Sequence, residues 1–385
     1  MRVVSLVTLV TPTGKYGGPV RVAVNQARAL RDRGHEVTIA GAQRGYGGSP
    51  PTDLDGVPAR LFPARTVLPG TGFAGLAAPG LHSWLREAVA ESDIVHLHLA
   101  RDLVTLPAAV HARRAGVPVV LQTHGMIDPS THPLARPLDA FWTRSVLRDA
   151  AAVLYLTPRE REGLIAVAGD RLRLVPLGNG VPHSRARQSR NGVEVLYLAR
   201  LAPRKRPEVF VEAAARLAAE FPAVRFRLVG PDEGRAGEVV QLAAESGADI
   251  VWEGPIGPEA TDARMSEASI YVLPAVDEPY PMSVLEAMAA GLPVIVTDSC
   301  GLAPAVEESG AGIVVGDSAD ALTAALRRLL ADQELRRAMG EAGRQAATGR
   351  FSMASIAREL LTVYRRAAAG PREDDPRDGD RRLRV

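Results

Sequence analysis

The chain has 385 residues, of which 46% are hydrophobic and 23% charged. This length is too great for a single hydrophobic core and predicts a globular protein of two domains. No uninterrupted apolar run reaches the roughly 18 residues that a membrane-spanning helix needs, so the sequence argues against an integral membrane protein. A single cysteine, Cys300, leaves no partner for an internal disulfide and is typical of a reducing cytoplasm.

The net charge of +2 is unevenly distributed. Residues 1–175 hold 20 Lys and Arg against 14 Asp and Glu, whereas residues 192–350 hold 15 against 24. Chance variation of the surface would explain this difference. A basic first half that meets an anionic partner, such as a membrane surface or a phosphorylated acceptor, is the functional alternative. Aromatic residues make up 4% of the chain and are not interleaved with basic ones, which argues against nucleic-acid binding.

The first half alternates strand-like and helix-like segments. VVSLVTLV, at the start, predicts a buried strand rather than a signal peptide, because it has no small-residue cleavage site and runs into a glycine loop. An amphipathic helix follows and ends at Gly34. Further strands are predicted in EVTIAG, IVHLHL, PVVLQTHG and AAVLYLT, with helices at 101–115 and 133–150. This alternation predicts parallel strands joined by right-handed crossovers.

The pattern pauses at residues 179–192, whose polar, basic and Pro- and Gly-containing sequence predicts an interdomain linker. It resumes with helices at 207–220, 235–246 and near 258–268, between strands in VEVLYLAR, VRFRLVG, IVWEGPI, IYVLPA, PVIVTD and GIVVG. We therefore predict an α/β protein of two doubly wound, Rossmann-like domains, 1–178 and 193–350, that face each other across a cleft. A helix at 351–368 is expected to pack back on the first domain, and 369–385 to form a disordered charged tail.

Ligands of doubly wound sheets bind beyond the carboxyl ends of the strands, so the loops that follow strands are the candidate sites. One such loop opens the stretch EPYPMSVLEAMAAGLPVIVTD, which carries Glu278 and Glu286. Pro281 suits the first position of a helix, whose positive end favours an anion through the free amides of Met282, Ser283 and Val284. A sugar and a ribose on either side of a phosphate would use both carboxylates as acceptors. An ordinary helix start with a solvated glutamate fits the spacing equally.

Lysine is rare in this chain, which has two lysines among 46 basic residues. Both Lys15 and Lys205 fall in glycine- or proline-marked loops after predicted strands. A compact ammonium in such a loop indicates a phosphate pocket, although a surface role fits Lys15 equally.

The whole stretch resembles the E-x7-E motif of the retaining glycosyltransferases of family GT4, which have the GT-B fold. The resemblance covers about residues 1–368. It implies that Glu278 holds the hydroxyls of the donor sugar and that Glu286 holds the ribose of the nucleotide.

Two other segments carry the same resemblance on the phosphate side. TPTGKYGGPVRV is similar to the family's first glycine loop, in which Gly17 and Gly18 would let the backbone approach the pyrophosphate. VLYLARLAPRKRP is similar to the segment whose arginine and lysine clamp the diphosphate, here Arg200 and Lys205. The family usually has glycine at the positions that hold Ala199 and Arg206.

His124 in LQTHGM matches the family histidine that reaches the donor sugar near the reacting carbon. His96 and His98 resemble a strand end that lines the acceptor side, and a structural role is the alternative. Asn179 matches an asparagine–glycine turn at the domain crossover and is expected to be structural. The apolar, glycine-rich segment 64–84 either contacts the acceptor or forms a packed surface loop.

The resemblance implies a metal-independent, retaining hexosyltransferase that moves a sugar from a UDP- or GDP-type donor to a hydroxyl of a glycan, a lipid-linked or a small natural-product acceptor. No cofactor is expected. Asp53 and Asp55 sit in a predicted turn rather than a metal site. The expected location is the cytoplasm, with peripheral membrane contact through the basic first domain as an option. A nucleotide-sugar epimerase of GT-B fold and a non-catalytic two-domain sugar-binding protein are the alternative functions.

Overall fold

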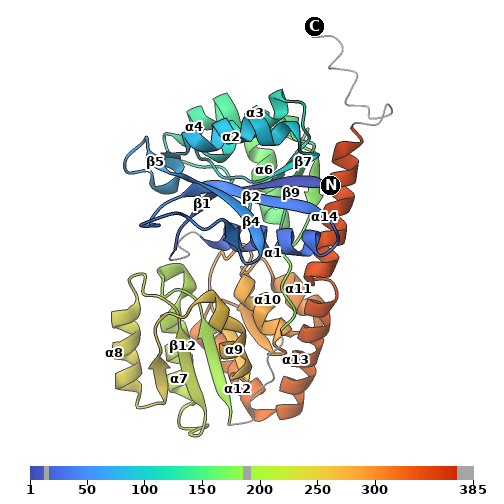
Figure 1. The fold of residues 1–385 in the computed structure, drawn as a ribbon. Coiled ribbons are helices and arrows are strands. Elements are labelled where there is room, and N and C mark those ends of the chain that lie inside the picture. Colours follow the sequence, from blue (N-terminus) through green and yellow to red (C-terminus); the bar gives the residue numbers. More distant parts are fainter. Residues whose placement is uncertain (13–16, 185–191, 371–385) are drawn as a thin grey trace. The chain divides into compact units, whose positions relative to one another are not determined.

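The computed structural model describes residues 1–12, 17–184 and 192–370 (Figure 1). They form two compact units: the first unit comprises Met1–Asn179 and the C-terminal segment from Met353, and the second unit comprises Gly180–Ser352. Lys15, most of the polar part of the predicted linker (185–191) and residues 371–385 of the predicted tail lie outside the described residues.

The first unit is built on an eight-stranded sheet in the order β10-β9-β8-β7-β1-β2-β4-β3. Neighbouring strands are parallel except for β3 and β4. The chain begins in the middle of the sheet and builds outward first on one side and then on the other, so the order reverses between β1 and β7. The strands are β1 (Arg2–Val10), β2 (Glu36–Gln43), β3 (Asp53–Leu54), β4 (Val57–Pro63), β7 (Ile94–His98), β8 (Val119–Gln122), β9 (Ala152–Tyr155) and β10 (Leu174–Pro176).

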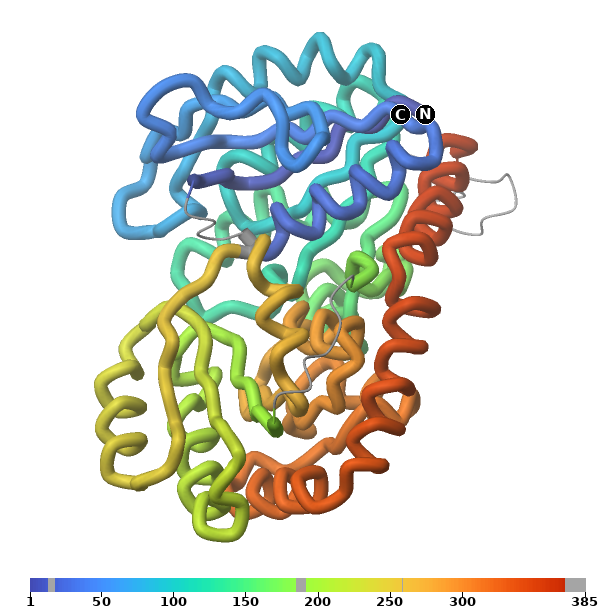
Figure 2. Tube along the Cα trace, turned by 60° about the horizontal axis from the view of Figure 1, so that its bottom comes forward, coloured from blue at the N-terminus to red at the C-terminus, as the bar shows by residue number. Residues whose placement is uncertain are grey.

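Helices cover both faces of this sheet (Figure 1). Val4 and Leu6 of β1 pack toward one face, and Val3 and Val7 toward the other, so the strand is buried on both sides as its continuous apolar run predicts. One face is covered by α2 (Pro79–Ala90), α3 (Thr105–Arg114), α5 (Arg144–Asp149) and α6 (Pro158–Ala168). The other face is covered by α1 (Gly17–Arg31) and α14 (Met353–Ala368), which run side by side in Figure 2.

The second unit has a fully parallel six-stranded sheet in the order β13-β12-β11-β14-β15-β16. This is the doubly wound order, and it reverses between β11 and β14. The strands are β11 (Glu194–Leu198), β12 (Arg225–Val229), β13 (Ile250–Trp252), β14 (Ile270–Leu273), β15 (Val294–Thr297) and β16 (Gly312–Val315).

The helices of the second unit also form two layers, each with its own apolar core. One layer consists of α9 (Thr261–Ser266), α10 (Met282–Ala289), α11 (Ala303–Ser309) and α13 (Gln333–Thr348). The other consists of α7 (Pro207–Leu217), α8 (Ala236–Ser246) and α12 (Ala319–Ala331). The short 3₁₀ segments η3 (Pro203–Lys205) and η4 (Pro258–Ala260) lie in loops of this unit.

Segment 57–84 differs from the sequence-based expectation. VPARLFP forms strand β4 because its side chains alternate, with Val57, Ala59 and Leu61 buried. The predicted loop 64–84 ends early, because α2 begins at Pro79. Proline suits this first helical position, since an N–H there would have no acceptor within the helix. The part before α2 contains the antiparallel pair β5 (Arg65–Thr66) and β6 (Leu76–Ala77) and the 3₁₀ segment η1 (Gly72–Gly75).

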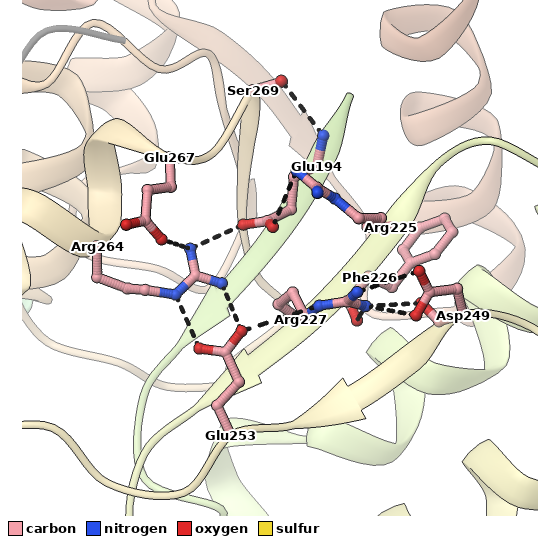
Figure 3. Close-up of polar contacts among 9 residues, drawn as sticks. All are labelled: Glu194, Arg225, Phe226, Arg227, Asp249, Glu253, Arg264, Glu267 and Ser269. Carbon is pink, nitrogen blue, oxygen red and sulfur yellow. Dashed lines mark hydrogen bonds and ion pairs between the residues drawn. The ribbon is translucent and has the colours of Figure 1, made fainter. Parts of the chain in front are cut away.

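An ion-pair network ties three elements of the second unit together (Figure 3). Arg264 of α9 donates from Nη1 to Glu194 Oε1 at 2.7 Å, and from Nε and Nη2 to the two oxygens of Glu253, both at 2.9 Å. Arg227 of β12 extends the network to Asp249 at 2.8 Å. Arg264 and Glu194 are buried, so their charges depend on each other rather than on water.

We expect Arg264→Met to lower the free energy of unfolding of the second unit by about 3 kcal/mol, because it leaves Glu194 buried beside an uncharged side chain. Hydrogen exchange of the β11 and β12 amides would measure this unit by itself. The matched control is Arg337→Met, which removes an exposed ion pair with Glu334 on α13. The control should change stability by less than about 1 kcal/mol. Equal effects of the two substitutions would contradict a structural role for the network.

Candidate active site

The strand order of the second unit reverses between β11 and β14, and the loops that follow these two neighbouring strands carry the predicted charged residues. Arg200 and Lys205 follow β11, and Glu278 follows β14. Crevices at such reversal points are where doubly wound sheets bind ligands. The fold therefore brings together residues that are more than 70 positions apart in the sequence.

Lys205 and Glu278 form the central contact of this site. Lys205 Nζ lies 2.8 Å from Glu278 Oε2, and Arg204 Nη2 lies 3.1 Å from the same oxygen. The Lys205 and Glu278 side chains are each 10% exposed, whereas that of Arg204 is 46% exposed. Burial lowers the pKa of the Lys205 ammonium, and the Glu278 carboxylate opposes that shift. Arg204 was not predicted from the sequence, although it adjoins Lys205 in the segment APRKRP.

The loop that carries these cations is held by its backbone. The buried Tyr197 hydroxyl donates to the carbonyl of Arg200 at 3.0 Å, and the Val276 amide donates to the carbonyl of Arg204 at 3.0 Å. Arg206 ends the loop with φ 51° and ψ 51°, in the left-handed region that favours glycine. This geometry explains why the similar family segment has glycine at this position.

Arg200 does not contact Glu278 in this structure. Its Nη1 donates to both carboxylate oxygens of Glu233, at 2.8 and 2.9 Å, and the two side chains are 52% and 43% exposed. An exposed ion pair of this kind contributes about 0–1 kcal/mol, so a phosphate could replace Glu233 at little cost. Glu233 is a further residue that the sequence did not indicate.

The structure corrects two details of the predicted helix start at α10. The helix begins at Met282, and Pro281 is its N-cap residue rather than its first helical residue. The amide of Val284 donates to the carbonyl of Pro281 at 3.1 Å, because the first turn closes on the cap, so Val284 does not offer the free amide that was predicted. The amides of Met282 and Ser283 remain the ones that a helix start leaves without an intrahelical acceptor.

Tyr271, in β14, connects this helix start to the neighbouring strand. Its hydroxyl lies 2.7 Å from Ser283 Oγ and 3.2 Å from the carbonyl of Leu198 at the end of β11. Burial raises the pKa of the Tyr271 hydroxyl, and the carboxylates of Glu286 and Glu278 add to this effect. Tyr271 therefore stays protonated. As an internal residue of an apolar strand, it gave no signal in the sequence.

In the first unit, the predicted glycines lie where α1 follows β1. Gly17 is the first residue of α1, and Gly18 is exposed beside it. A Cβ built on Gly18 would meet no heavy atom of the described chain within 4 Å. Among the described residues, none fills the space next to Gly18, which lies after the strand at which this sheet reverses.

Three histidines gather at the ends of β7 and β8. His98 Nδ1 and His124 Nε2 are 2.7 Å apart and share one hydrogen bond, with their rings nearly parallel at 9°. His96 Nδ1 lies 2.8 Å from the hydroxyl of Tyr364 in α14. Burial lowers the pKa of His124 and of His96 to about 3, and it lowers the pKa of His98 well below its usual value. The three histidines are therefore neutral at physiological pH. Within the cluster, His124, which was predicted to contact the sugar, is hydrogen-bonded to His98.

Glu160, in α6, positions the turn that carries His124. Its Oε1 accepts hydrogen bonds from the Thr123 hydroxyl at 2.5 Å and the Gly125 amide at 2.6 Å. These bonds flank His124, whose φ of 52° is unusual for a residue other than glycine. Glu160 lies 36 positions from His124, and nothing in the sequence linked the two.

The residues expected to be structural have partners within the first unit. Asn179 Oδ1 accepts a hydrogen bond from Gln122 at 2.9 Å. Asp53 Oδ1 accepts from the Gly56 amide at 2.8 Å in the turn between β3 and β4. Within residues 1–12, 17–184 and 192–370, no three His, Cys, Asp or Glu side chains converge in a way that could hold a metal ion.

Comparisons with known proteins agree with this architecture. A family model described as "Glycosyl transferase 4-like domain" matches residues 17–180, and one described as "Glycosyl transferases group 1" matches residues 184–346. The D-inositol 3-phosphate glycosyltransferase of Kineococcus radiotolerans is 30% identical, over 95% of this chain and 94% of that protein. The alpha-D-kanosaminyltransferase of Streptomyces kanamyceticus is 29% identical, over 66% of this chain and 72% of that protein.

Solved structures share the fold. Anabaena Alr3699/HepE in complex with UDP superposes with a TM-score of 0.73 at 18% identity, covering 94% of this chain and 99% of that chain. The sucrose-phosphate synthase of Thermosynechococcus elongatus gives a TM-score of 0.70 at 19% identity, covering 96% and 100%. The chain belongs to the GT4 family of glycosyltransferases, and its two doubly wound units are those of the GT-B fold. The predicted family, fold class and glycosyltransferase activity are thereby confirmed.

The neutral histidines predict how stability depends on pH. Because the pKa of His96 is lowered from 6.5 to about 3 on folding, the unfolded chain binds more protons in that interval. The stability that His96 contributes is complete above about pH 6.5 and is lost as the pH falls toward 3, by up to about 1.4 kcal/mol per pH unit. Urea unfolding at about pH 7.5 and about pH 5.5 would measure the loss.

His96→Phe keeps a ring in place but cannot titrate, so we expect it to reduce the loss of stability between these two pH values. His183→Phe, at an exposed position in the second unit, is the matched control and should keep the wild-type pH dependence. If His96→Phe and the wild type lose equal stability over this range, the histidine is not held neutral by folding.

Proposed function

We propose that this protein transfers a sugar, with retention of anomeric configuration, from a nucleoside-diphosphate sugar to an acceptor hydroxyl. The observation that supports this most directly is the group formed by Lys205, Glu278 and the start of α10 at the strand-order reversal of the second unit. It combines a buried cation, a carboxylate and helix amides at the carboxyl ends of two neighbouring strands. A diphosphate that carries hydroxyl-rich groups at both ends needs these three kinds of partner.

The diphosphate would be bound by Lys205, Arg200 and the amides of Met282 and Ser283. Without donor, the Lys205 ammonium is neutralised by Glu278. Arrival of the diphosphate would give Lys205 a second anionic partner, and Arg200 would exchange its exposed pair with Glu233 for a phosphate oxygen. These fixed charges would then stabilise the negative charge that develops on the leaving diphosphate.

The two glutamates would hold the two ends of the donor. Glu278, which lies against Lys205, would accept hydrogen bonds from hydroxyl groups of the transferred sugar. Glu286, on the second turn of α10, would accept hydrogen bonds from the ribose hydroxyls. The Tyr271 hydroxyl, bonded to Ser283, would fix the helix start between them. His124 would contact the sugar as a neutral group, with His98 holding its ring orientation.

Retention fits this set of groups through a displacement on one face of the sugar. The bond from the anomeric carbon to the phosphate oxygen breaks, the acceptor oxygen forms its bond on the same face, and the acceptor proton passes to the departing phosphate oxygen. The protein's contribution is positioning and charge stabilisation. The UDP in the Anabaena structure supports a UDP-type donor for this chain, with a GDP-type donor as the alternative.

We propose a cytoplasmic location, which the free and buried Cys300 supports. Peripheral contact of the basic first unit with a membrane is the further option that the charge distribution leaves open. Across the described ranges, no helix combines the length and apolar character required to cross a bilayer.

We expect the two glutamates to differ when each loses its charge. Glu286→Gln should weaken binding of free nucleoside diphosphate by about 1–3 kcal/mol, because a neutral amide is a poorer acceptor for ribose hydroxyls. Glu278→Gln should not weaken that affinity, because it removes a negative charge that competes with the diphosphate for Lys205. It should reduce turnover of the full donor, because it loses its contacts with the sugar. Calorimetry with UDP and GDP, beside nucleoside-diphosphate release from a panel of donor sugars, would measure both quantities.

The matched control is Glu307→Gln, an exposed glutamate on α11, which should retain wild-type affinity and turnover. If Glu278→Gln loses nucleotide affinity as severely as Glu286→Gln, the proposed division of roles is wrong. Release of nucleoside diphosphate without transfer to any acceptor, or conversion of the donor into an epimer, would overturn the proposed reaction itself.

Because Lys205, Arg200 and the start of α10 supply positive charge to the diphosphate, we expect activity to continue in EDTA. Nucleoside-diphosphate release measured before and after chelation would test this expectation. Loss of activity in EDTA, followed by recovery with Mg²⁺ or Mn²⁺, would show that a cation is needed beside these residues.

A further inference from the structure

The first unit contains an open pocket of about 660 Å³. Its lining comes from three separate segments: residues 68–74 after β5, residues 101–103 after β7, and residues 130–142 after β8. The last two segments follow the strands that carry His98 and lead to His124. The pocket therefore lies at the same carboxyl edge of the sheet as the proposed sugar-contacting histidine.

Large apolar side chains are exposed around this pocket to an unusual degree. The described residues include seven large hydrophobic side chains classed as exposed, and four of these line the pocket: Leu68, Leu134, Phe141 and Trp142. Phe141 is 79% exposed. It lies in the π-helical segment η2 (Asp139–Thr143), between α4 (Ala135–Leu138) and α5, and such segments are frequent at functional sites. A concentration of exposed apolar surface around a hollow marks a binding site for an apolar group.

The charge of the pocket is already compensated. Arg101 is the sole Lys, Arg, Asp or Glu among its described lining residues. Its guanidinium donates to both oxygens of Asp139, at 2.8 and 3.1 Å, and to the carbonyl of Asp128 at 2.5 Å. With its side chain 13% exposed, Arg101 is committed to these partners rather than to a ligand phosphate.

Polar side chains of the lining are also engaged with the chain. Thr71 Oγ1 donates to the carbonyl of Leu68 at 2.8 Å, and Ser130 Oγ accepts from the His132 amide at 3.2 Å. His132 Nδ1 accepts from the Leu134 amide at 3.2 Å. These hydrogen bonds direct polar atoms toward the backbone, so a ligand in the pocket would meet mainly carbon.

We propose that this pocket binds the apolar part of a small, uncharged acceptor, whose hydroxyl is the group that receives the sugar. The volume of the pocket is within the range of binding sites for drug-sized molecules. Its walls come from three separate segments, so the exposed apolar side chains surround a hollow. The compensated Arg101 disfavours a phosphorylated acceptor here. The role as acceptor site rests on the proposed transferase function, whereas the binding of apolar groups does not.

The test uses n-alkyl β-D-glucosides, from methyl to octyl, each below its micellar concentration. Calorimetry of the full chain without donor should show Kd falling by about fourfold for each added methylene until the pocket is filled. Ala74→Trp, which places a large ring among the lining residues, and Phe141→Ser should both remove this dependence on chain length. Val251→Ser is the matched control, because Val251 is an exposed apolar residue of the second unit.

Hydrogen exchange of the β7 and β8 amides, which lie in the same unit as the pocket, verifies that this unit is folded in each variant and should equal that of the wild type. Equal affinity of the wild type for methyl and octyl glucosides would overturn the proposal. So would a Val251→Ser effect as large as that of Phe141→Ser. If the alkyl chains have no effect but Phe141→Ser abolishes binding to phosphatidylcholine–phosphatidylglycerol vesicles, the surface contacts membranes and the proposal is wrong. Chain-length-dependent binding without sugar transfer from any donor would instead contradict the proposed transferase function alone.

Discussion

The buried contact between Lys205 and Glu278 is the interaction on which the proposed chemistry depends. Two opposite charges with little access to water cannot be separated cheaply, so the loops after β11 and β14 are fixed relative to each other. Tyr197 and Tyr271 add hydrogen bonds on either side of this contact. The second unit thus holds Lys205 and Glu278 in place, as the proposed electrostatic catalysis requires.

In the first unit, the histidines of the candidate site are uncharged. Burial keeps His96, His98 and His124 neutral, so in the proposed reaction they would make hydrogen bonds without adding charge. Their chain of contacts ends at Tyr364, and Glu160 fixes the turn around His124 through the Gly125 amide. The contrast between the charged Lys205 and Glu278 of the second unit and the neutral histidines of the first unit fits the two halves of the proposed reaction: departure of an anion and entry of a hydroxyl group.

Most of the fold was predictable because strands buried on both faces are continuous apolar runs, and helices between them keep a period near 3.6 residues. β4 was missed because its prolines and arginine obscure a half-buried alternation. Glu278, Glu286, Arg200 and Lys205 were predicted from spacing and family resemblance. Tyr271, Glu160 and Glu233 were not predicted, because each makes its contact between segments that only the fold brings together, which no local pattern records.

The position of α14 has a consequence for how the chain reaches its folded state during synthesis. The second unit is one continuous segment, from Gly180 to Ser352, so its residues are synthesised one after another without interruption. The first unit needs both ends of the chain, since Ile356, Leu360 and Tyr364 complete one face of its core. We therefore expect one face of the sheet in the first unit to stay incompletely covered until α14 has been synthesised. The order of synthesis and the order of completion are opposite for these two units.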